Sequence, residues 1–283
     1  MLDKFAIFIC THGRPNKQST LKALRSQGYT GKVYLVLDDT DKSIQQYINN
    51  FGTDNLIIFN KQHYIDTVDT GVVPPNYKTI LYAKVAVEDI AKHMNLTSFV
   101  IADDDITKFR IRYIVEDSLR SFSEVELDKI FEAYNTYLLE ANFTALGVCS
   151  NVQLIAGKSV FNPDIIAKFR TPYNFVFRNI TKEVNWVSSF GEDIITAINS
   201  NKRGSLMWSI PYCQIDLTPP GSCADGGMSE VYKSISTFKL CEYDFMYNPS
   251  SILLRTHGKV WNAQILKNQA FPKIVSDKYK KEK

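Results

Sequence analysis

The opening part of the chain alternates short apolar runs with stretches of helical spacing, and this alternation restricts the possible folds more than any other feature. Residues 5–10, 32–37 and 55–59 are rich in β-branched and aromatic side chains, which favour strands. Between them, residues 16–26 and 43–51 have helical periodicity, and a glycine ends each stretch. The order strand, helix, strand, helix, strand predicts βαβ units and the opening half of a mostly parallel, nucleotide-binding sheet.

The rest of the chain continues the alternation less regularly. Helical periodicity recurs over residues 78–94 and 124–140, and a short helix is expected to begin within residues 190–194 and to end near Asn199. Strands are expected over residues 98–102, 145–152, 160–161, 173–180, 206–213 and 252–255, and strands and loops over the remainder. No repeat or linker divides the chain, so we expect one α/β domain over residues 1–283, with helices on both faces of its sheet. Residues 1–110 form the nucleotide-binding half and residues 111–283 an elaborated second half.

Composition excludes several classes of protein. With 45% apolar and 22% charged residues, the chain is neither disordered nor fibrous, and its net charge of +3 permits a nucleic-acid partner without indicating one. The five cysteines are odd in number and contain no Cys-x-x-Cys pair, which favours free thiols in a reducing compartment. The apolar run at residues 5–10 is too short to cross a bilayer. We therefore expect a cytoplasmic protein with no membrane partner.

Three consecutive carboxylates follow the expected strand at residues 98–102, where ligands bind in open α/β sheets. Asp103, Asp104 and Asp105 repel one another unless a cation or donor groups compensate them. Mg²⁺ and Mn²⁺ take such oxygen ligands together with substrate phosphates. In an extended chain Asp103 and Asp105 share one side, so that one can hold the metal while the other binds a sugar or ribose hydroxyl. The alternative is an acidic turn that is left in water.

Three further places in the chain carry candidate chemistry. Glu192 and Asp193 begin a short helix, where they either stabilise its positive end or supply a general base for an alcohol acceptor. Thr11 and Arg14 lie in a strand-to-helix turn and suit a phosphate or a base edge, although the turn lacks the glycine-rich fingerprints of NAD enzymes and P-loop NTPases. His257 is a lone histidine after an expected strand, and such residues are more often structural than metal-ligating.

Together these motifs resemble those of GT-A glycosyltransferases. More narrowly, the chain is similar to the TET-associated phage glycosyltransferases that decorate hydroxymethylpyrimidines in DNA. The narrower likeness lies in residues 33–39, 57–61, 66–69 and 102–109, and beyond residue 110 mainly in Gly191-Glu192-Asp193 and the late His257. The resemblance implies a Rossmann-like GT-A sheet, a nucleotide-sugar donor such as UDP-glucose, and Mn²⁺ or Mg²⁺ as the metal.

The resemblance also implies a role for each matching residue. Asp103 and Asp105 correspond to the acidic motif that binds metal and donor, His257 to the late metal ligand, and Asp193, paired with Glu192, to the catalytic base. Thr11, Arg14 and Asp38 or Asp39 would line the nucleotide site. Lys84 stands where similar proteins often have arginine, so it keeps the charge of that donor contact but not its bidentate geometry. With Asp193 facing the acceptor, inversion at the sugar carbon is the simpler outcome.

The implied acceptor is DNA that contains a hydroxymethylated pyrimidine. Basic and aromatic side chains that recur in the second half suit phosphate contacts and base stacking, among them Lys108, Arg110, Arg112, Lys168, Arg170, Arg178, Lys182, Lys202, Arg203, Trp186, Trp208, Tyr212 and Trp261. The alternative for these residues is a solvated basic face over aromatic core residues. Alternatives for the whole chain are a glycosyltransferase that acts on a surface polysaccharide or protein, and a non-catalytic nucleotide-sugar or DNA-binding module.

Overall fold

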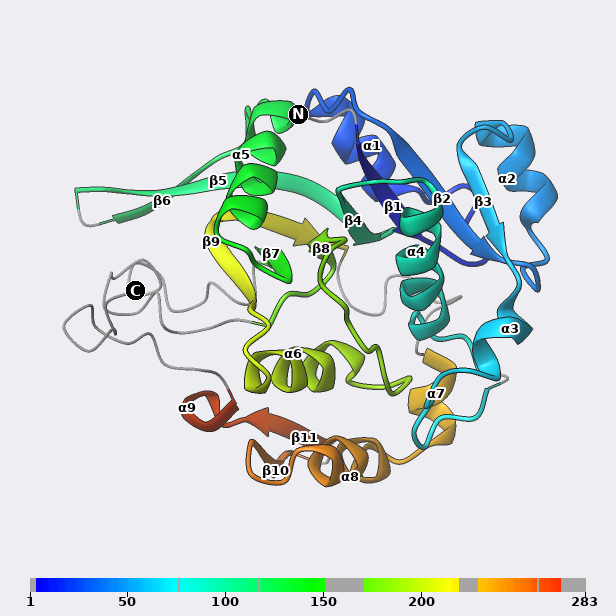
Figure 1. Ribbon diagram of the computed structural model, residues 1–283, viewed down its shortest axis with the longest axis vertical. Helices are drawn as coiled ribbons and strands as arrows, with labels where there is room; N and C mark the ends of the chain where they lie inside the picture. Colours follow the sequence, from blue (N-terminus) through cyan, green and yellow to red (C-terminus); the bar gives the residue numbers. More distant parts are fainter. Residues whose placement is uncertain are drawn as a thin grey trace.

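A single mixed sheet forms the centre of the molecule (Figure 1). The computed structural model describes residues 4–75, 77–116, 118–150, 171–218, 229–258 and 260–270. Within these residues nine strands pair in the order β3-β2-β1-β4-β8-β7-β9-β5-β6. Their bounds are β1 Phe5–Cys10, β2 Val33–Asp38, β3 Leu56–Phe59, β4 Ser98–Asp103, β5 Ile106–Val115, β6 Ser118–Phe122, β7 Ala145–Ser150, β8 Phe175–Asn179 and β9 Met207–Leu217. The expected α/β fold is confirmed.

The two ends of the sheet differ in strand direction. Strands β3, β2, β1 and β4 are all parallel, as the βαβ order of the sequence predicts. Beyond β4, strand β8 runs antiparallel to both β4 and β7, β9 is parallel to β7, and β5 is antiparallel to β9 and β6. The parallel part therefore places the carboxyl ends of β1, β2 and β4 along one edge of the sheet.

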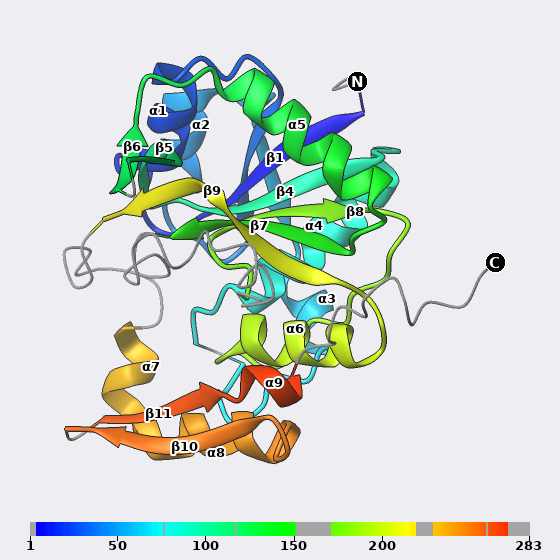
Figure 2. The same ribbon diagram turned by 90° about the vertical axis from the view of Figure 1, so that its left-hand side faces the viewer.

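Helices cover both faces of the sheet (Figure 2). The helices α1 Ser19–Ser26, α2 Ile44–Phe51 and α5 Leu127–Glu140 pack on one face, and α3 Lys61–Ile65, α4 Leu81–His93 and α6 Glu192–Lys202 pack on the other. Successive side chains of a strand point to opposite faces. Accordingly, Phe5, Ile7 and Ile9 of β1 pack in the core beneath α1, α2 and α5. The residues between them pack in the core on the other face, beneath α3, α4 and α6. All six residues of β1 are buried, which explains why this strand is a continuous apolar run.

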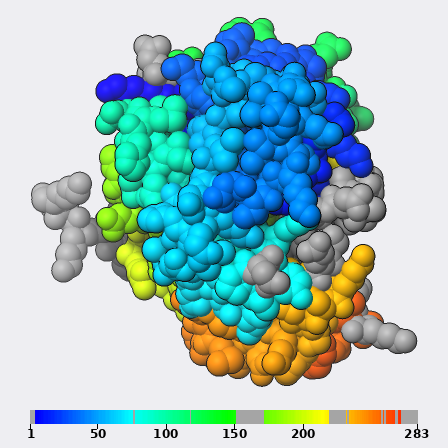
Figure 3. All heavy atoms as spheres, turned by 90° about the vertical axis from the view of Figure 1, so that its right-hand side faces the viewer, coloured from blue at the N-terminus to red at the C-terminus, as the bar shows by residue number. Residues whose placement is uncertain are grey.

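The C-terminal segment forms a separate layer below α6. It contains α7 Ser229–Ser234, α8 Thr237–Tyr247, an antiparallel hairpin of β10 Ile252–His257 and β11 Val260–Ile265, and α9 Lys267–Ala270. Figure 3 shows this orange and red segment beneath the blue and cyan first half. The expectation of strands and loops is wrong for α7, α8 and α9. Helix α8 is rich in aromatic residues, which favour strands locally, but Leu240, Cys241 and Asp244 form a stripe buried against its neighbours, and this tertiary packing decides its conformation.

A hairpin after the aspartate triplet was also not anticipated. Only Asp103 belongs to β4; the chain turns at Asp104 and Asp105 and continues as β5, which pairs with β9 and with β6. The premise that the triplet is extended is therefore wrong, although the strand before it is confirmed. The β5–β6 hairpin projects from the side of the sheet (Figure 1). The expected strand at residues 160–161 lies outside the described residues.

The structure also bears on the expected free thiols and on the expected lack of a membrane-spanning segment. Cys10, Cys149, Cys213 and Cys241 are buried free thiols, and Cys223 lies outside the described residues. Within the part of the chain that the structure describes, no helix is long and apolar enough to cross a membrane.

One ion pair lies inside the core. The guanidinium of Arg178, on β8, is fully buried and donates two hydrogen bonds to the carboxylate of Glu88 on α4, at 2.7 and 3.1 Å. The same carboxylate accepts a hydrogen bond from the indole N–H of Trp186 at 3.1 Å. Arg178 and Trp186 were expected among residues that suit nucleic acid. That expectation is wrong for both, because their polar groups are fully used inside the protein.

Replacement of Glu88 by glutamine should reduce the free energy of unfolding by about 3 kcal/mol, since it leaves the buried charge of Arg178 without a counter-ion. Urea titration followed by circular dichroism would measure the change. The double variant Glu88→Met with Arg178→Met is the control, because it removes both charges and should recover much of the loss. A loss below about 1 kcal/mol for Glu88→Gln would contradict a desolvated pair.

Candidate active site

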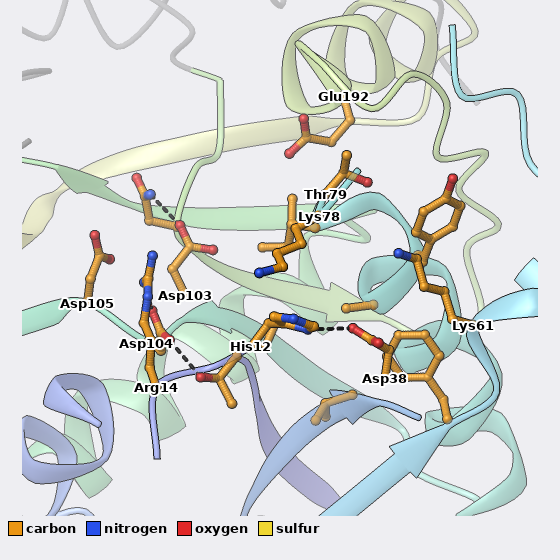
Figure 4. A pocket seen from close by; sticks show the side chains of 18 of the residues that line it. His12, Arg14, Asp38, Lys61, Lys78, Thr79, Asp103, Asp104, Asp105 and Glu192 are labelled. Atoms are coloured by element: carbon orange, nitrogen blue, oxygen red, sulfur yellow. Dashed lines mark hydrogen bonds and ion pairs between the residues drawn. The ribbon is translucent and has the colours of Figure 1, made fainter. Parts of the chain in front are cut away.

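A cavity of about 450 Å³ opens where the carboxyl ends of β1, β2 and β4 meet. Its volume is in the range of small-molecule sites. Strand β1 and its turn contribute Thr11 and Arg14, β2 contributes Asp38, and β4 with its turn contributes the aspartate triplet. Glu192 and Asp193 enter from the start of α6. The structure thus brings most of the sequence-predicted site residues to one cavity (Figure 4).

Asp104 holds the turn between β1 and α1 in place. Its carboxylate accepts a hydrogen bond from the Thr11 hydroxyl at 2.6 Å and forms an ion pair with Arg14 at 2.7 Å. Gly13, between them, has a φ of 68°, a conformation that a residue with a side chain rarely adopts. Thr11 and Arg14 therefore lie at the cavity wall as expected, and Asp104, to which the sequence assigned no individual role, positions them.

Asp103 and Asp105 have different surroundings at the same edge of the cavity. Asp103 accepts a hydrogen bond from the side-chain amide of Asn174 at 2.5 Å. Burial raises the pKa of Asp103 to about 7, with Lys84 opposing this rise and Asp105 adding to it. Asp105 has one buried carboxylate oxygen, Oδ1, without a hydrogen-bond partner. Two carboxylates that repel each other, one with an unused oxygen, fit a hard divalent cation.

Asp38 and Asp39 separate into two roles. The Asp38 carboxylate lies 2.8 Å from Nδ1 of His12 and lines the cavity. Burial raises its pKa, but hydrogen bonds from His12 and Thr40 outweigh this effect and lower the pKa to about 2. The carboxylate of Asp39 accepts the backbone N–H of Lys61 at 3.0 Å and does not line the cavity. Of these two candidates, Asp38 lines the cavity and Asp39 does not.

Two cations of the cavity have no role in the sequence-based prediction. Lys61 is only 8% exposed, and its ammonium lies 5.5 Å from the centre of the Tyr82 ring. Lys78 precedes α4 and extends between His12 and Thr79 (Figure 4). With Arg14 they give the cavity three cations, which suit a diphosphate. Lys61 ends residues 57–61, one of the segments in which the chain resembles the family, so the sequence could have pointed to it. No sequence motif points to Lys78.

Lys84 neutralises the two acids at the start of α6. Its ammonium lies 2.5 Å from Asp193 and 2.9 Å from Glu192, and 5.0 Å from the centre of the Trp186 ring. Burial raises the pKa of Asp193, which Lys84 opposes. For Lys84, burial lowers the pKa, but the two carboxylates outweigh it and hold the pKa above its ordinary value. Lys84 itself is buried and does not line the cavity.

His257 does not belong to the central sheet. Its backbone ends β10 and pairs with Val260 of β11. Its side chain lies outside the described residues. Among the residues whose placement is described, no group of three or more histidine, cysteine or acidic side chains could hold a metal ion. The structure therefore shows two candidate carboxylate ligands, Asp103 and Asp105, and no third described ligand beside them.

Comparison with known proteins agrees with this geometry. The sequence pattern that defines the TET-associated glycosyltransferases matches residues 5–214, a range that includes every residue named at the cavity. The chain belongs to this family. No curated protein matches this glycosyltransferase.

Solved structures similar to this glycosyltransferase are GT-A enzymes. A mannosyltransferase from Pyrobaculum calidifontis, in complex with GDP-Man and Mn²⁺, has a TM-score of 0.50 and 10% identity, over 86% of this chain and 62% of that one. Glucosyl-3-phosphoglycerate synthase from Mycobacterium tuberculosis, in complex with Mg²⁺ and UDP, has a TM-score of 0.44 and 9% identity, over 93% of this chain and 86% of that one. The first likeness confirms the GT-A fold and concerns the fold alone.

The buried carboxyl of Asp244 should make the stability of the fold depend on pH in an unusual way. Asp244, on α8, is fully buried, and burial, with Glu192 adding to it, raises its pKa to about 8. Its pKa in the unfolded chain is about 3.9, so the folded state holds the extra proton between these values. Stability should therefore fall as the pH rises from about 4 through 8. Asp244→Asn should weaken this fall, as measured by urea unfolding at pH 5, 7 and 9. Equal slopes for both proteins would contradict a raised pKa.

Proposed function

We propose that this protein transfers a sugar from a nucleotide sugar, in the first instance UDP-glucose, to the hydroxymethyl group of a 5-hydroxymethylpyrimidine in DNA. Family membership supports glycosyl transfer. The observation that carries the donor assignment is the cavity that Asp103 and Asp105 line together with Arg14, Lys61 and Lys78. Acidic and basic side chains in one cavity suit a diphosphate bound together with its metal ion. The DNA acceptor rests on the likeness to the phage enzymes.

The donor would occupy the cavity in a fixed direction. Asp38, at the end of β2 and paired with His12, offers its carboxylate to ribose hydroxyls or the base. Arg14 and Lys78 lie on the diphosphate side, close to the aspartate triplet in Figure 4. Asp103 and Asp105 would hold Mn²⁺ or Mg²⁺, which neutralises the charge of the departing diphosphate. The sugar then lies toward Glu192 and Asp193.

Asp193 is the proposed general base. The acceptor oxygen attacks the anomeric carbon while the bond from that carbon to the diphosphate oxygen breaks, and the bonding electrons leave with the diphosphate. Asp193 takes the proton of the attacking hydroxyl. Its raised pKa favours proton uptake near neutral pH, and Lys84 positions its carboxylate at 2.5 Å. A single displacement of this kind inverts the configuration of the anomeric carbon.

The β5–β6 hairpin is a candidate DNA contact. It carries Arg112 and the exposed Arg120, together with the exposed apolar side chains of Tyr113 and Phe122. Arginine binds phosphates, and aromatic rings stack on unpaired bases. Arg110 is already paired with Asp216 at 2.6 Å, and Lys168 and Arg170 lie outside the described residues.

The acceptor can be tested directly. The protein should add a sugar to DNA that contains 5-hydroxymethylcytosine or 5-hydroxymethyluracil, and not to unmodified DNA, because only the hydroxymethyl oxygen supplies a nucleophile. Mass spectrometry of nucleosides after incubation with a panel of nucleotide sugars would detect the product. Modification of a polysaccharide or a protein, with hydroxymethylated DNA unchanged, would contradict the DNA assignment and leave glycosyl transfer standing.

The contact between the β5–β6 hairpin and DNA can be tested by substitution. Charge reversal at Arg112 and Arg120 should weaken DNA binding at least about tenfold and reduce its dependence on salt concentration. Hydrolysis of the donor in the absence of DNA should stay unchanged. Lys129→Glu is the control for a charge change outside the hairpin, since the Lys129 side chain is 77% exposed on α5. An equal effect of this control would show that only general charge matters.

Transfer should require a divalent metal ion. A chelator should abolish activity and Mn²⁺ or Mg²⁺ should restore it, because the departing diphosphate needs its charge neutralised. Asp105→Asn should raise the metal concentration for half-maximal activity at least about tenfold, since it removes a charged ligand. His257→Ala tests the late ligand in the same titration. Full turnover in excess chelator would exclude a metal site at Asp103 and Asp105.

The base can be separated from the helix-capping alternative. Asp193→Asn should slow transfer by about 10² or more while the protein still folds and binds donor, which is the usual contribution of a positioned base. Glu192→Gln should have a smaller effect. Single-turnover kinetics and donor binding by calorimetry would measure both. A rate change below about tenfold, together with lower thermal stability, would favour capping.

A further inference from the structure

A second cavity, of about 400 Å³, lies on the other side of the acid pair. It shares Glu192 and Asp193 with the donor cavity. Its remaining wall comes from the C-terminal layer and from the segment before β8, including Tyr173, Asp244 and Trp261. A group bound there can therefore reach the carboxylates that the donor's sugar approaches from the first cavity.

Asp244 is the unexplained residue of this cavity. Its side chain is fully buried, it lines the cavity, and neither carboxylate oxygen has a hydrogen-bond partner. The Asp244 carboxylate fits at this place only beside a glycine, because a Cβ on Gly191 would lie 2.4 Å from Asp244 Oδ1. Gly191 also has a φ of 66°. A buried carboxyl with no partner is strongly unfavourable unless a ligand completes its hydrogen bonds.

The chemistry of the wall restricts the ligand. Its described acidic members are Glu192, Asp193 and Asp244, and the residues known to line it include no lysine, arginine or histidine. A phosphate or another anion would be repelled. Lys84 already neutralises Glu192 and Asp193, so a metal ion has less to gain from these carboxylates. Aromatic rings of Tyr173 and Trp261 instead suit a flat, uncharged ring.

We propose that the second cavity is the acceptor pocket, which holds the pyrimidine ring of a hydroxymethylated nucleotide flipped out of the DNA, with Asp244 bonded to its Watson–Crick edge. This inference rests on the proposed function. Enzymes that modify bases commonly bind the flipped base by stacking and by bonds to that edge. The hydroxymethyl group then points to Asp193, the proposed base.

The protonation of Asp244 agrees with this role. Its pKa, raised to about 8 by burial and by Glu192, leaves the carboxyl mainly neutral at pH 7. A neutral carboxyl presents one donor and one acceptor side by side. Cytosine offers an acceptor at N3 beside a donor at N4, and uracil offers a donor at N3 beside an acceptor at O4. Asp244 can thus bond either ring through two hydrogen bonds.

Steady-state kinetics with an oligonucleotide that carries one 5-hydroxymethylcytosine would test the pocket. Asp244→Leu and Trp261→Ala should each raise the KM for the oligonucleotide, or lower kcat/KM, at least about tenfold. Hydrolysis of the donor without DNA should change less than about twofold. Asp244→Asn should stay within about threefold of the unmodified protein, because an amide also presents a donor beside an acceptor.

Two further measurements separate this role from a structural one. Phe238→Ala is the matched control for Trp261→Ala, since the Phe238 ring lies 5.0 Å from that of Trp261 but does not line the cavity. It should leave the KM unchanged. A 2-aminopurine placed opposite the target base should brighten when the unmodified protein binds, and brighten less with Trp261→Ala.

The possible outcomes distinguish failure of the acceptor pocket from failure of the proposed function. Transfer by the unmodified protein, with the KM unchanged in both Asp244→Leu and Trp261→Ala, would overturn the pocket and leave the proposed function intact. No transfer to hydroxymethylated DNA with any donor would overturn the proposed function and the pocket with it. A raised KM in the pocket variants and a normal KM in Phe238→Ala would support the pocket.

Discussion

The buried ammonium of Lys84 joins the two halves of this protein. It lies on α4, within the first 110 residues, and contacts Glu192 and Asp193 at the start of α6. Two adjacent carboxylates that line cavities are unfavourable without a counter-charge, and a buried lysine is unfavourable without a carboxylate. Each side therefore needs the other. The ion pair fixes the two acids where they line both cavities, and both functional proposals depend on that placement.

The aspartate triplet shows how one turn gives three identical side chains different surroundings. Asp103 ends β4 and is bonded to Asn174, Asp104 turns inward to Thr11 and Arg14, and Asp105 keeps an oxygen without a partner. The repulsion that the sequence implies is thus relieved for Asp104 by donors within the protein. It remains for Asp103 and Asp105. Those two are the carboxylates for which a cation is the natural partner.

The site lies where the parallel part of the sheet ends. Strand β4 has β1 as its parallel neighbour and β8 as its antiparallel neighbour. Loops from the parallel strands supply the donor cavity, whereas the segment before β8 supplies Tyr173 and Asn174. One residue of this dipeptide contacts Asp103 and the other lines the second cavity. The change of strand direction therefore brings residues of both cavities to the same pair of acids.

From the sequence alone, the strand and helix pattern of the first half could be derived, because a sheet covered on both faces requires continuous apolar strands such as β1. The aspartate triplet could be found because three carboxylates after a buried strand need a ligand or a partner, and the Glu192–Asp193 pair because two acids begin an expected helix. Only the tertiary structure decided which partner each acquired. Lys84 and Arg178 are both basic residues among apolar neighbours, yet their carboxylates lie about a hundred positions away in the chain, at separations of 108, 109 and 90 residues. Such contacts cannot be predicted from the local sequence, because burial and charge pairing act between residues that become neighbours only when the chain folds.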